Sequence, residues 1–149
     1  MKALTIRQPW ASAVALGWKP IENRRWQTHH RGPIAIHAGV GVGNRAEFDG
    51  AVARVADLSG RTEEVVRALT QVRGAIIAVA DLEEVCGDSL WQGQLSPLQC
   101  DCGPWAFSQS RHFRLGNARR LVNPIPAKGA LNLWNVPAEA RALMLAEVA

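Results

Sequence analysis

The sequence predicts a single α+β domain, residues 1–149, whose sheet curls into a small β-barrel with flanking helices. The 149 residues, 48% of them apolar, can build one hydrophobic core but not two comfortable ones. Segments typical of strands and helices follow the order strand, helix, strands, two helices and strands again, which favours a sheet combined with segregated helices. The same order is also compatible with an open sheet.

The first elements are short and closely spaced. Residues 2–6 are expected to form a strand, and residues 9–16 a helix that starts at a proline and ends before Gly17, where a C-terminal cap belongs. Strands are expected at residues 20–26 and 34–38, on either side of a glycine-proline turn.

Two helices are predicted next. Asn44 and Glu47 have the spacing of a capping box, so one helix is expected to begin after Asn44. Thr62, followed by two glutamates, marks the start of the other. The apolar residues at helical spacing in this second helix, which would form its buried stripe, are Val65, Leu69 and Val72.

The C-terminal half returns to strands. An apolar run opens a strand at residues 74–85, and the stretch 86–104, rich in turn-forming residues and without clear periodicity, indicates a long loop. The remaining expected elements are strands at 112–122 and 131–136, a turn-rich segment at 123–129 between them, and a helix that begins at Pro137.

Charge is segregated along the chain, although the net charge is only +4. Residues 1–38 carry six lysines and arginines against a single acid, Glu22, and residues 103–136 carry five bases and no acid. Residues 81–101 carry five acids and no base. If the two basic segments meet in the fold, they form a positive surface that attracts a polyanion in a salt-dependent way. An ordinary solvated surface is the alternative.

Other compositional features argue against a membrane protein and a disulfide scaffold. The apolar runs are short, and Arg7 and Gln8 interrupt the N-terminal one before it reaches the length of a secretion signal. Three cysteines are an odd set in a chain of this size, which favours a reducing compartment. We therefore expect a cytoplasmic protein without membrane association.

One short segment combines three chemically distinct side chains. On a strand at residues 20–26, Glu22, Arg24 and Trp26 would point to the same face. A carboxylate, a guanidinium and an indole can bind a base edge, hold a phosphate and stack on a ring, as in the recognition of unpaired nucleic acid. The alternative is a salt-bridged pair beside a buried tryptophan.

A family resemblance centres on the same segment. GWKPIENR, residues 17–24, matches GxKxxExR, the signature of the ASCH domain family, and the preceding LTIRQPWASAVALG resembles the opening of bacterial members. The resemblance continues through RGPIAIHA, GAIIAVADL and NPIPAKGALNLW. It implies a PUA-like β-barrel with the signature lining a cleft between barrel and helix. Members of this family are associated with RNA binding, and some resemble small hydrolases or nucleases.

The resemblance also implies which residues form the site. Its signature residues are Lys19, Glu22 and Arg24, and the neighbours it implies at the same end of the barrel are Arg7, Gln8 and Trp10. Trp26 joins the expected nucleic-acid-binding residues from the alternation along the strand. The favoured function is binding of single-stranded RNA or a modified nucleoside in a positively charged cleft. The alternative is a small hydrolase, a ribonuclease or nucleoside amidohydrolase, that uses Lys19 and Glu22 in catalysis. Relatives that remove an acyl group from a modified cytidine look as if they use a threonine where this chain has Glu22, which argues against that particular activity.

Two further groups of residues are candidate sites. Arg119, Arg120 and Lys128 could extend a phosphate track from the cleft, or could be solvated surface charges. Zinc-ligand types are supplied by Cys86, Cys100, Cys102 and His112, but a CxC pair without a second clear pair favours ordinary thiols. The sequence therefore predicts no metal and no cofactor, and it identifies no protein partner.

Overall fold

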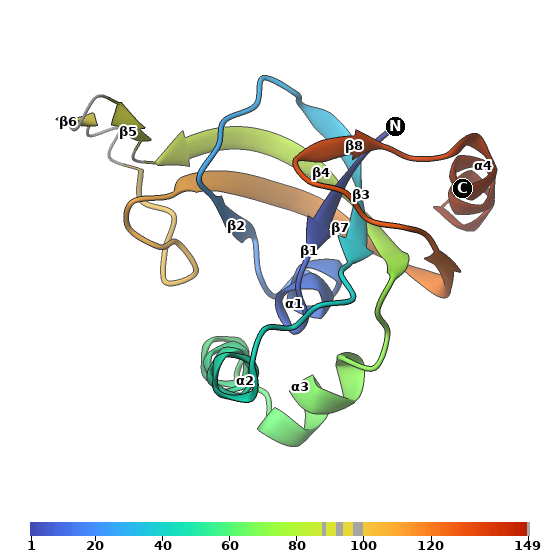
Figure 1. Cartoon of the computed structure of the whole chain (residues 1–149), viewed down its shortest axis with the longest axis horizontal. Helices are drawn as coiled ribbons and strands as arrows, with labels where there is room; N and C mark the ends of the chain where they lie inside the picture. Colours follow the sequence, from blue (N-terminus) through green and yellow to red (C-terminus); the bar gives the residue numbers. More distant parts are fainter. Residues whose placement is uncertain (88, 92–93, 97–99, 149) are drawn as a thin grey trace.

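A computed structural model of the chain describes residues 1–87, 89–91, 94–96 and 100–148 (Figure 1). It confirms the α+β fold. Six strands form one mixed sheet in the order β2-β7-β4-β3-β1-β8, which curls into a half barrel with β2 and β8 at its edges. The strands of this sheet are β1 (Lys2–Ile6), β2 (Ile21–Arg24), β3 (Gly32–Ala38), β4 (Ala75–Gly87), β7 (Arg111–Pro126) and β8 (Leu133–Asn135).

The curl of the sheet comes from its two longest strands. β4 and β7 pair antiparallel over most of their lengths, and their register shifts at three places. Such bulges bend a strand and increase its twist, so the pair wraps around the core instead of lying flat. β1 pairs in parallel with β3 and antiparallel with β8, which joins the two ends of the chain in one sheet.

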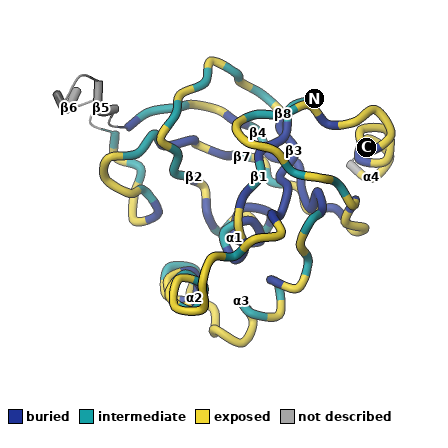
Figure 2. The backbone as a smooth tube through the Cα atoms, in the orientation of Figure 1, coloured by how far each residue is buried: buried dark blue, intermediate teal, exposed yellow. Residues whose placement is uncertain are grey.

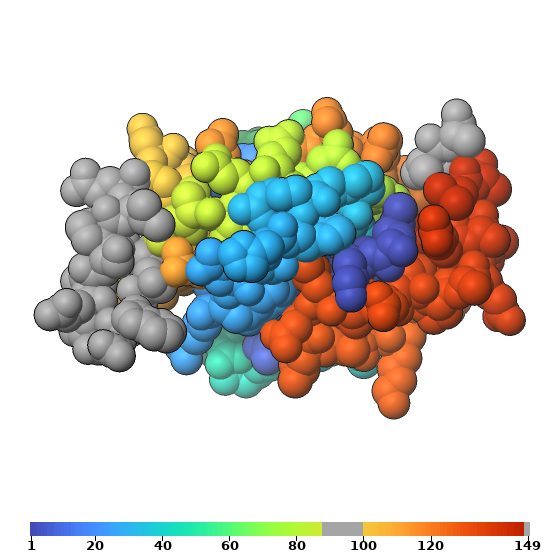
Figure 3. All heavy atoms as spheres, turned by 90° about the horizontal axis from the view of Figure 1, so that it is seen from above, coloured from blue at the N-terminus to red at the C-terminus, as the bar shows by residue number. Residues whose placement is uncertain are grey.

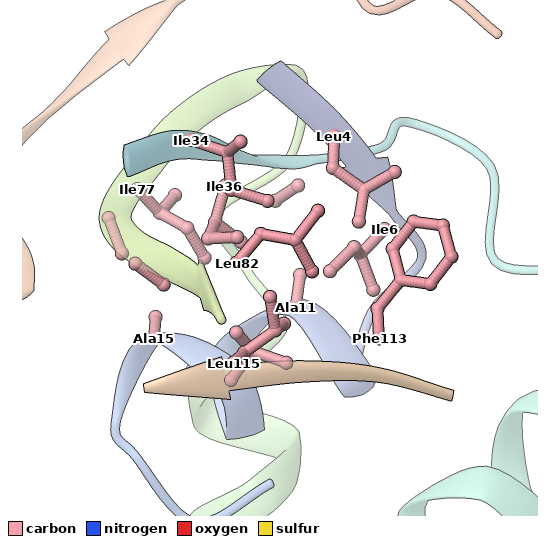
Figure 4. Packing of buried hydrophobic residues seen from close by; sticks show 14 residues of the cluster. Leu4, Ile6, Ala11, Ala15, Ile34, Ile36, Ile77, Leu82, Phe113 and Leu115 are labelled. Carbon is pink, nitrogen blue, oxygen red and sulfur yellow. The ribbon is translucent and has the colours of Figure 1, made fainter. Parts of the chain in front are cut away.

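The concave side of the sheet encloses the main core together with α1 (Trp10–Ala15). Figure 4 shows aliphatic side chains from β1, β3, β4 and β7 pointing toward one another and toward α1. Five consecutive residues of α1, 11–15, are buried, because the helix lies inside the curl (Figure 2). The predicted strand at residues 2–6 and the short helix after it are confirmed.

The other helices lie outside the curl. α2 (Arg45–Ser59) begins at Asn44, whose side chain and that of Glu47 form the predicted capping box. α3 (Glu63–Leu69) begins at Thr62, whose hydroxyl accepts from the Val65 amide. α4 (Ala138–Val148) contacts β7, on the far side of the sheet from α2 and α3 (Figure 1).

Three local predictions differ from the structure. The buried residue of α3 is Val66, while Val65 is 45% exposed, so the helix is turned by about one residue from the expected face. The turn-rich segment 123–129 is strand as far as Pro126, because its turn residues lie at a register shift between β4 and β7. Within the expected loop 86–104, β4 continues to Gly87, and a short hairpin pairs β5 (Ser89–Trp91) with β6 (Gln94–Ser96). The rest of that loop prediction falls on residues 88, 92–93 and 97–99, which lie outside the described residues.

Helix lengths bear on membrane insertion as well. Within the described residues, no helix is both long and apolar enough to cross a membrane.

Candidate functional site

The signature segment links the buried helix α1 to the edge strand β2. Gly17 has a positive φ of 72°, so the chain can turn sharply where α1 ends. After this turn the amides of Trp18 and Lys19 both donate to the carbonyl of Ala13 in α1. Lys19 is thereby held under the helix, and β2 starts beside it.

Lys19, Glu22 and Arg24 form a continuous charge network. Lys19 is 3% exposed, and its Nζ donates to the Ile21 carbonyl and, at 2.5 Å, to Glu22 Oε2. The other oxygen of Glu22 lies 3.2 Å from Nη2 of Arg24. One buried carboxylate is therefore shared by two cations, which offsets the cost of removing these charges from water.

The Arg24 guanidinium is also held by β1, and one of its donors has no hydrogen-bond partner among the described residues. Its Nη2 also donates to the carbonyl of Thr5 in β1, at 2.7 Å. Its Nε is buried and has no hydrogen-bond partner among the described residues. A buried guanidinium donor without a partner is rare in proteins, and such groups are often found at functional sites.

Two adjoining cavities border this network, and together we name them the cleft. The larger measures about 810 Å³ and the smaller about 230 Å³. Residues common to both are Trp10, Glu22, Asn23, Arg24 and Arg25. Lys19 and Phe107 line only the smaller cavity, while Arg7 and Trp26 line only the larger one.

The larger cavity lies where distant segments of the chain meet. Its far wall consists of residues 130–132, which precede β8, and its near wall of residues 22–26. Figure 3 shows the segment that leads into β3 beside the segment around β8. The edge strands β2 and β8 thus bring the signature close to the C-terminal part of the domain.

Aromatic side chains flank the cations of the cleft. The ring of Trp10 packs edge-on against Phe107, with 6.3 Å between ring centroids, and Lys19 Nζ lies 5.7 Å from the Trp10 centroid. Trp26 packs edge-on against Phe113 of the core and is half-buried, with the cleft beside it. Phe107 is 44% exposed.

The predicted site residues are thus brought together only in part. Gln8 is buried, and its side chain donates to the Val72 carbonyl at 2.9 Å and accepts from the Ser12 amide at 3.0 Å. It therefore joins α1 to the segment after α3. Arg119 is exposed on β7 opposite Val79 of β4, beyond the part of β7 that pairs with β2.

Lys128 lies closer to the cleft than Arg119 does. It is exposed and borders a cavity of about 410 Å³ that shares three lining residues, Thr5, Ala130 and Leu131, with the larger cavity of the cleft. Arg120 lines a different cavity, next to Leu121 and Pro124. Of the three bases in the expected phosphate track, Lys128 is thus the one whose cavity adjoins the cleft.

Sequence patterns missed several residues that complete the site. Arg25 follows the signature directly and lines both cavities, but the signature ends at Arg24. Asn23 pins the loop before β7, since its amide group donates to the Trp105 carbonyl at 2.9 Å and accepts from the Phe107 amide at 2.8 Å. The position of Asn23 inside the signature segment, between Glu22 and Arg24, was a signal, whereas nothing local marks Phe107.

A second group of side chains, three thiols and an imidazole, lies where the same loop meets β4 and β7. One potential ligand atom each of Cys86, Cys100, Cys102 and His112 falls within 4.8 Å of the other three. Three thiols and one imidazole are the donor types of structural zinc sites. The sequence favours ordinary thiols over a metal, because a CxC pair without a second clear pair is a weak zinc signal.

Fold and site together define a class of protein: a small α+β half-barrel domain with a cationic, aromatic-lined cleft at one edge strand. The particular family follows from comparison with family models. The ASCH domain matches residues 4–134, so the chain belongs to the ASCH domain family.

The chain is also similar in sequence to two curated proteins. Human activating signal cointegrator 1 is 25% identical over 134 residues, which are 89% of this chain and 22% of the human protein. The mouse protein of the same name is 26% identical over 133 residues, with the same coverage. The chain thus spans about a fifth of the length of the curated relatives it matches.

Solved structures show the same fold. A crystal structure of ASCH from Zymomonas mobilis aligns with a TM-score of 0.54 at 17% identity and covers 97% of this chain and 93% of the bacterial one. A mutant of the Zymomonas mobilis ASCH protein aligns with a TM-score of 0.53, again at 17% identity, with coverage of 97% and 96%.

Proposed function

We propose that this domain binds single-stranded RNA or a modified nucleoside in the cleft. The observation that carries the proposal is Arg24, which lines both cavities, is held by Glu22 and the Thr5 carbonyl, and has an Nε without a hydrogen-bond partner among the described residues. An anionic or carbonyl oxygen in the cleft would accept a charge-assisted hydrogen bond from this guanidinium. The relation of the ASCH family to RNA binding supports a nucleic-acid ligand.

The composition of the cleft suits an unpaired nucleotide. Arg7 and Arg25 are exposed at its border and can neutralise phosphate, while Trp10 and Phe107 offer ring surfaces for stacking. A volume of about 810 Å³ falls within the range of small-molecule sites and leaves room for one flipped-out base with its sugar. Unpaired RNA is commonly recognised by stacking together with hydrogen bonds to splayed bases.

Lys19 and Glu22 act as positioning residues in this proposal. Both oxygens of Glu22 are engaged, one by Lys19 and one by Arg24, so the carboxylate orients the Arg24 guanidinium toward the ligand. Lys19 compensates the buried charge of Glu22. Removing Glu22 would leave the buried Lys19 without a carboxylate partner and cost about 3–5 kcal/mol of stability, while removing Lys19 would leave Glu22 paired with Arg24 alone. Both alanine variants therefore disturb the network itself and are poor probes of binding.

The hydrolase alternative uses the same two residues differently. A catalytic Lys19 would have to give up a proton so that its nitrogen could act as base or nucleophile. Its Nζ instead donates to two acceptors, the Ile21 carbonyl and the Glu22 carboxylate. This arrangement favours a charged, structural lysine, and hence binding without chemistry.

The border arginines provide the test of binding. We expect Arg7→Gln and Arg25→Gln each to weaken binding of a fluorescently labelled single-stranded RNA by roughly tenfold, which corresponds to about 1.4 kcal/mol. Fluorescence anisotropy at low salt measures the affinity. Arg141→Gln, at an exposed position of α4, is the matched control and should bind like the wild type. Equal affinity of all four proteins would refute the assignment of the cleft.

Incubation with the same RNA and with a panel of acylated nucleosides tests the alternative. Binding without chemistry predicts unchanged substrate after prolonged incubation. Product formed by the wild type and lost in Lys19→Met, in a variant still folded by circular dichroism, would establish the hydrolase instead.

A further inference from the structure

We propose that Cys86, Cys100, Cys102 and His112 bind one structural zinc ion that fastens the loop before β7 to the sheet. The inference does not depend on the proposed RNA binding. It rests on the convergence of four ligand side chains from three separate parts of the chain.

The sheet itself places two of these ligands side by side. Cys86 lies near the end of β4 and His112 near the start of β7, and the two are paired across the antiparallel ladder. Side chains of directly paired residues project to the same face of a sheet. Cys100 and Cys102 enter from the loop, and their spacing of two lets both sulfurs reach the same point.

The distances are those of an arrangement ready for a tetrahedral ion. Cys86 Sγ lies 3.2 Å from Cys102 Sγ, and Cys100 Sγ lies 3.1 Å from His112 Nδ1. With Zn–S bonds of about 2.3 Å and Zn–N bonds of about 2.0 Å, tetrahedral ligand atoms lie roughly 3.5–3.8 Å apart. The two close pairs therefore need to open by only about half an ångström to admit the ion. Cys86 and Cys102 are free thiols in this structure, so both sulfurs are available as ligands.

His112 is held in the state that a metal requires. Its Nε2 lies 2.6 Å from the Phe107 carbonyl, an acceptor, so the ring proton belongs on Nε2. Nδ1 then carries its lone pair toward the three sulfurs. A metal-binding histidine almost always makes such a hydrogen bond with its other nitrogen, because the bond orients the ring and selects the tautomer.

Gly87 keeps the space beside the site open. Its φ is +93°, and a Cβ at this position would lie 2.5 Å from the Ser110 carbonyl oxygen and 2.9 Å from His112 Nδ1. Any side chain would collide with the proposed ligand atom. Position 87 therefore has to be a glycine to leave room for the His112 ring at the proposed site.

The site would have a clear structural task. The loop it fastens carries Trp105, which is buried among α1, α2 and β2, and Phe107, which lines the cleft. Two hydrogen bonds with the Asn23 side chain hold this loop on one side, and the proposed zinc would hold it on the other. Three thiolates and one imidazole make a closed set of four, typical of structural zinc and without an open position for catalysis.

Metal analysis of the full chain, purified under reducing conditions without added metal, tests the proposal. We expect about one zinc per chain in the wild type, measured by inductively coupled plasma mass spectrometry, and loss of zinc to background in Cys100→Ala and His112→Gln. His29→Gln, at an exposed histidine, is the control and should retain its zinc. Zinc retained in both ligand variants, or stoichiometric iron or copper in its place, would overturn the assignment.

A spectroscopic measurement on the wild type covers the case in which the ligand variants do not fold. After chelation of the metal under reducing conditions, Co²⁺ should produce the visible bands of a tetrahedral site and a thiolate-to-metal charge-transfer band, both abolished by added Zn²⁺. Zinc should also raise the midpoint of thermal unfolding, because it binds the folded state. A reduced protein with three reactive thiols, no cobalt bands and no thermal shift with zinc would contradict the proposal.

Discussion

Glu22 is the residue on which the candidate site depends. Its two oxygens join Lys19, delivered by the turn after α1, to Arg24, which also contacts β1. The three charges leave an excess of one positive charge next to the cleft. The predicted alternation of Glu22 and Arg24 on one face of a strand accounts for their contact, whereas the burial of Lys19 depends on its packing beneath α1.

His37 is a second buried titratable residue, and it leads to a prediction about pH. Burial lowers the pKa of His37 below its usual 6.5, and the hydrogen bond of its Nε2 to the Ala127 carbonyl opposes part of this shift. Its Nδ1 is buried and has no partner among the described residues, and the ring packs edge-on against Trp134. These surroundings favour the neutral ring.

Just below pH 6.5, His37 is therefore protonated in the unfolded chain but stays neutral in the folded chain. The contribution of His37 to the free energy of unfolding is fully present above pH 6.5 and declines as the pH falls from there through the lowered pKa. We expect His37→Gln to remove this part of the pH dependence in urea unfolding between about pH 7 and pH 5. Parallel curves for the wild type and His37→Gln would contradict the prediction; His29→Gln, at an exposed site, should behave like the wild type.

At the scale of elements, helix ends were predictable because their signals are local. The Asn44 side chain accepts from the Glu47 amide at 2.9 Å, and the Asn44 amide donates to the Glu47 carboxylate at 3.1 Å. These contacts lie within one turn and need no tertiary partner. The buried face of α3 was misjudged by one residue, because which face is buried depends on where the rest of the fold lies.

The cap gives a prediction for α2. Asn44→Ala should lower the free energy of unfolding by about 1 kcal/mol, because it removes the acceptor of one otherwise unpaired helix amide. Urea unfolding followed by circular dichroism measures the loss. Asn44→Asp preserves the acceptor and should remain within a few tenths of a kcal/mol of the wild type. If Asn44→Ala and Asn44→Asp were equally stable, the capping box would contribute nothing.

On the scale of the whole molecule, the fold redistributes the charges seen along the chain. β2 pairs with the start of β7, so the basic N-terminal segment meets the basic segment after residue 103, as Arg24 opposite Arg111 illustrates. Part of this charge is compensated, since Arg114 lies 3.1 Å from Glu84 of the acidic segment. The cleft keeps a net positive charge, since Arg7 and Arg25 line it without an ion-pair partner among the described residues, while Arg24 and Lys19 share Glu22.

Salt dependence tests that distribution. Each phosphate neutralised on a single strand contributes about −0.7 to the slope of log K against log salt concentration, so three arginines predict a slope of about −2. Arg25→Gln should reduce the slope by about 0.7, while Arg141→Gln should leave it unchanged. Titrations of labelled RNA at several salt concentrations provide the slope. A slope near zero for the wild type would mean that the cleft does not engage the phosphate backbone.

The sequence by itself determined most of the elements, the signature and most cations of the cleft. Caps, turn glycines and alternating apolar residues act over a few positions, and the Lys19, Glu22 and Arg24 set lies within one such stretch. Tertiary structure decided the partners from elsewhere: Phe107 reaches the cleft, Gln8 turns inward, and Cys86 meets His112. The reason is physical: strand pairing joins residues far apart in the chain, and its register depends on packing of the entire core, which no local pattern encodes.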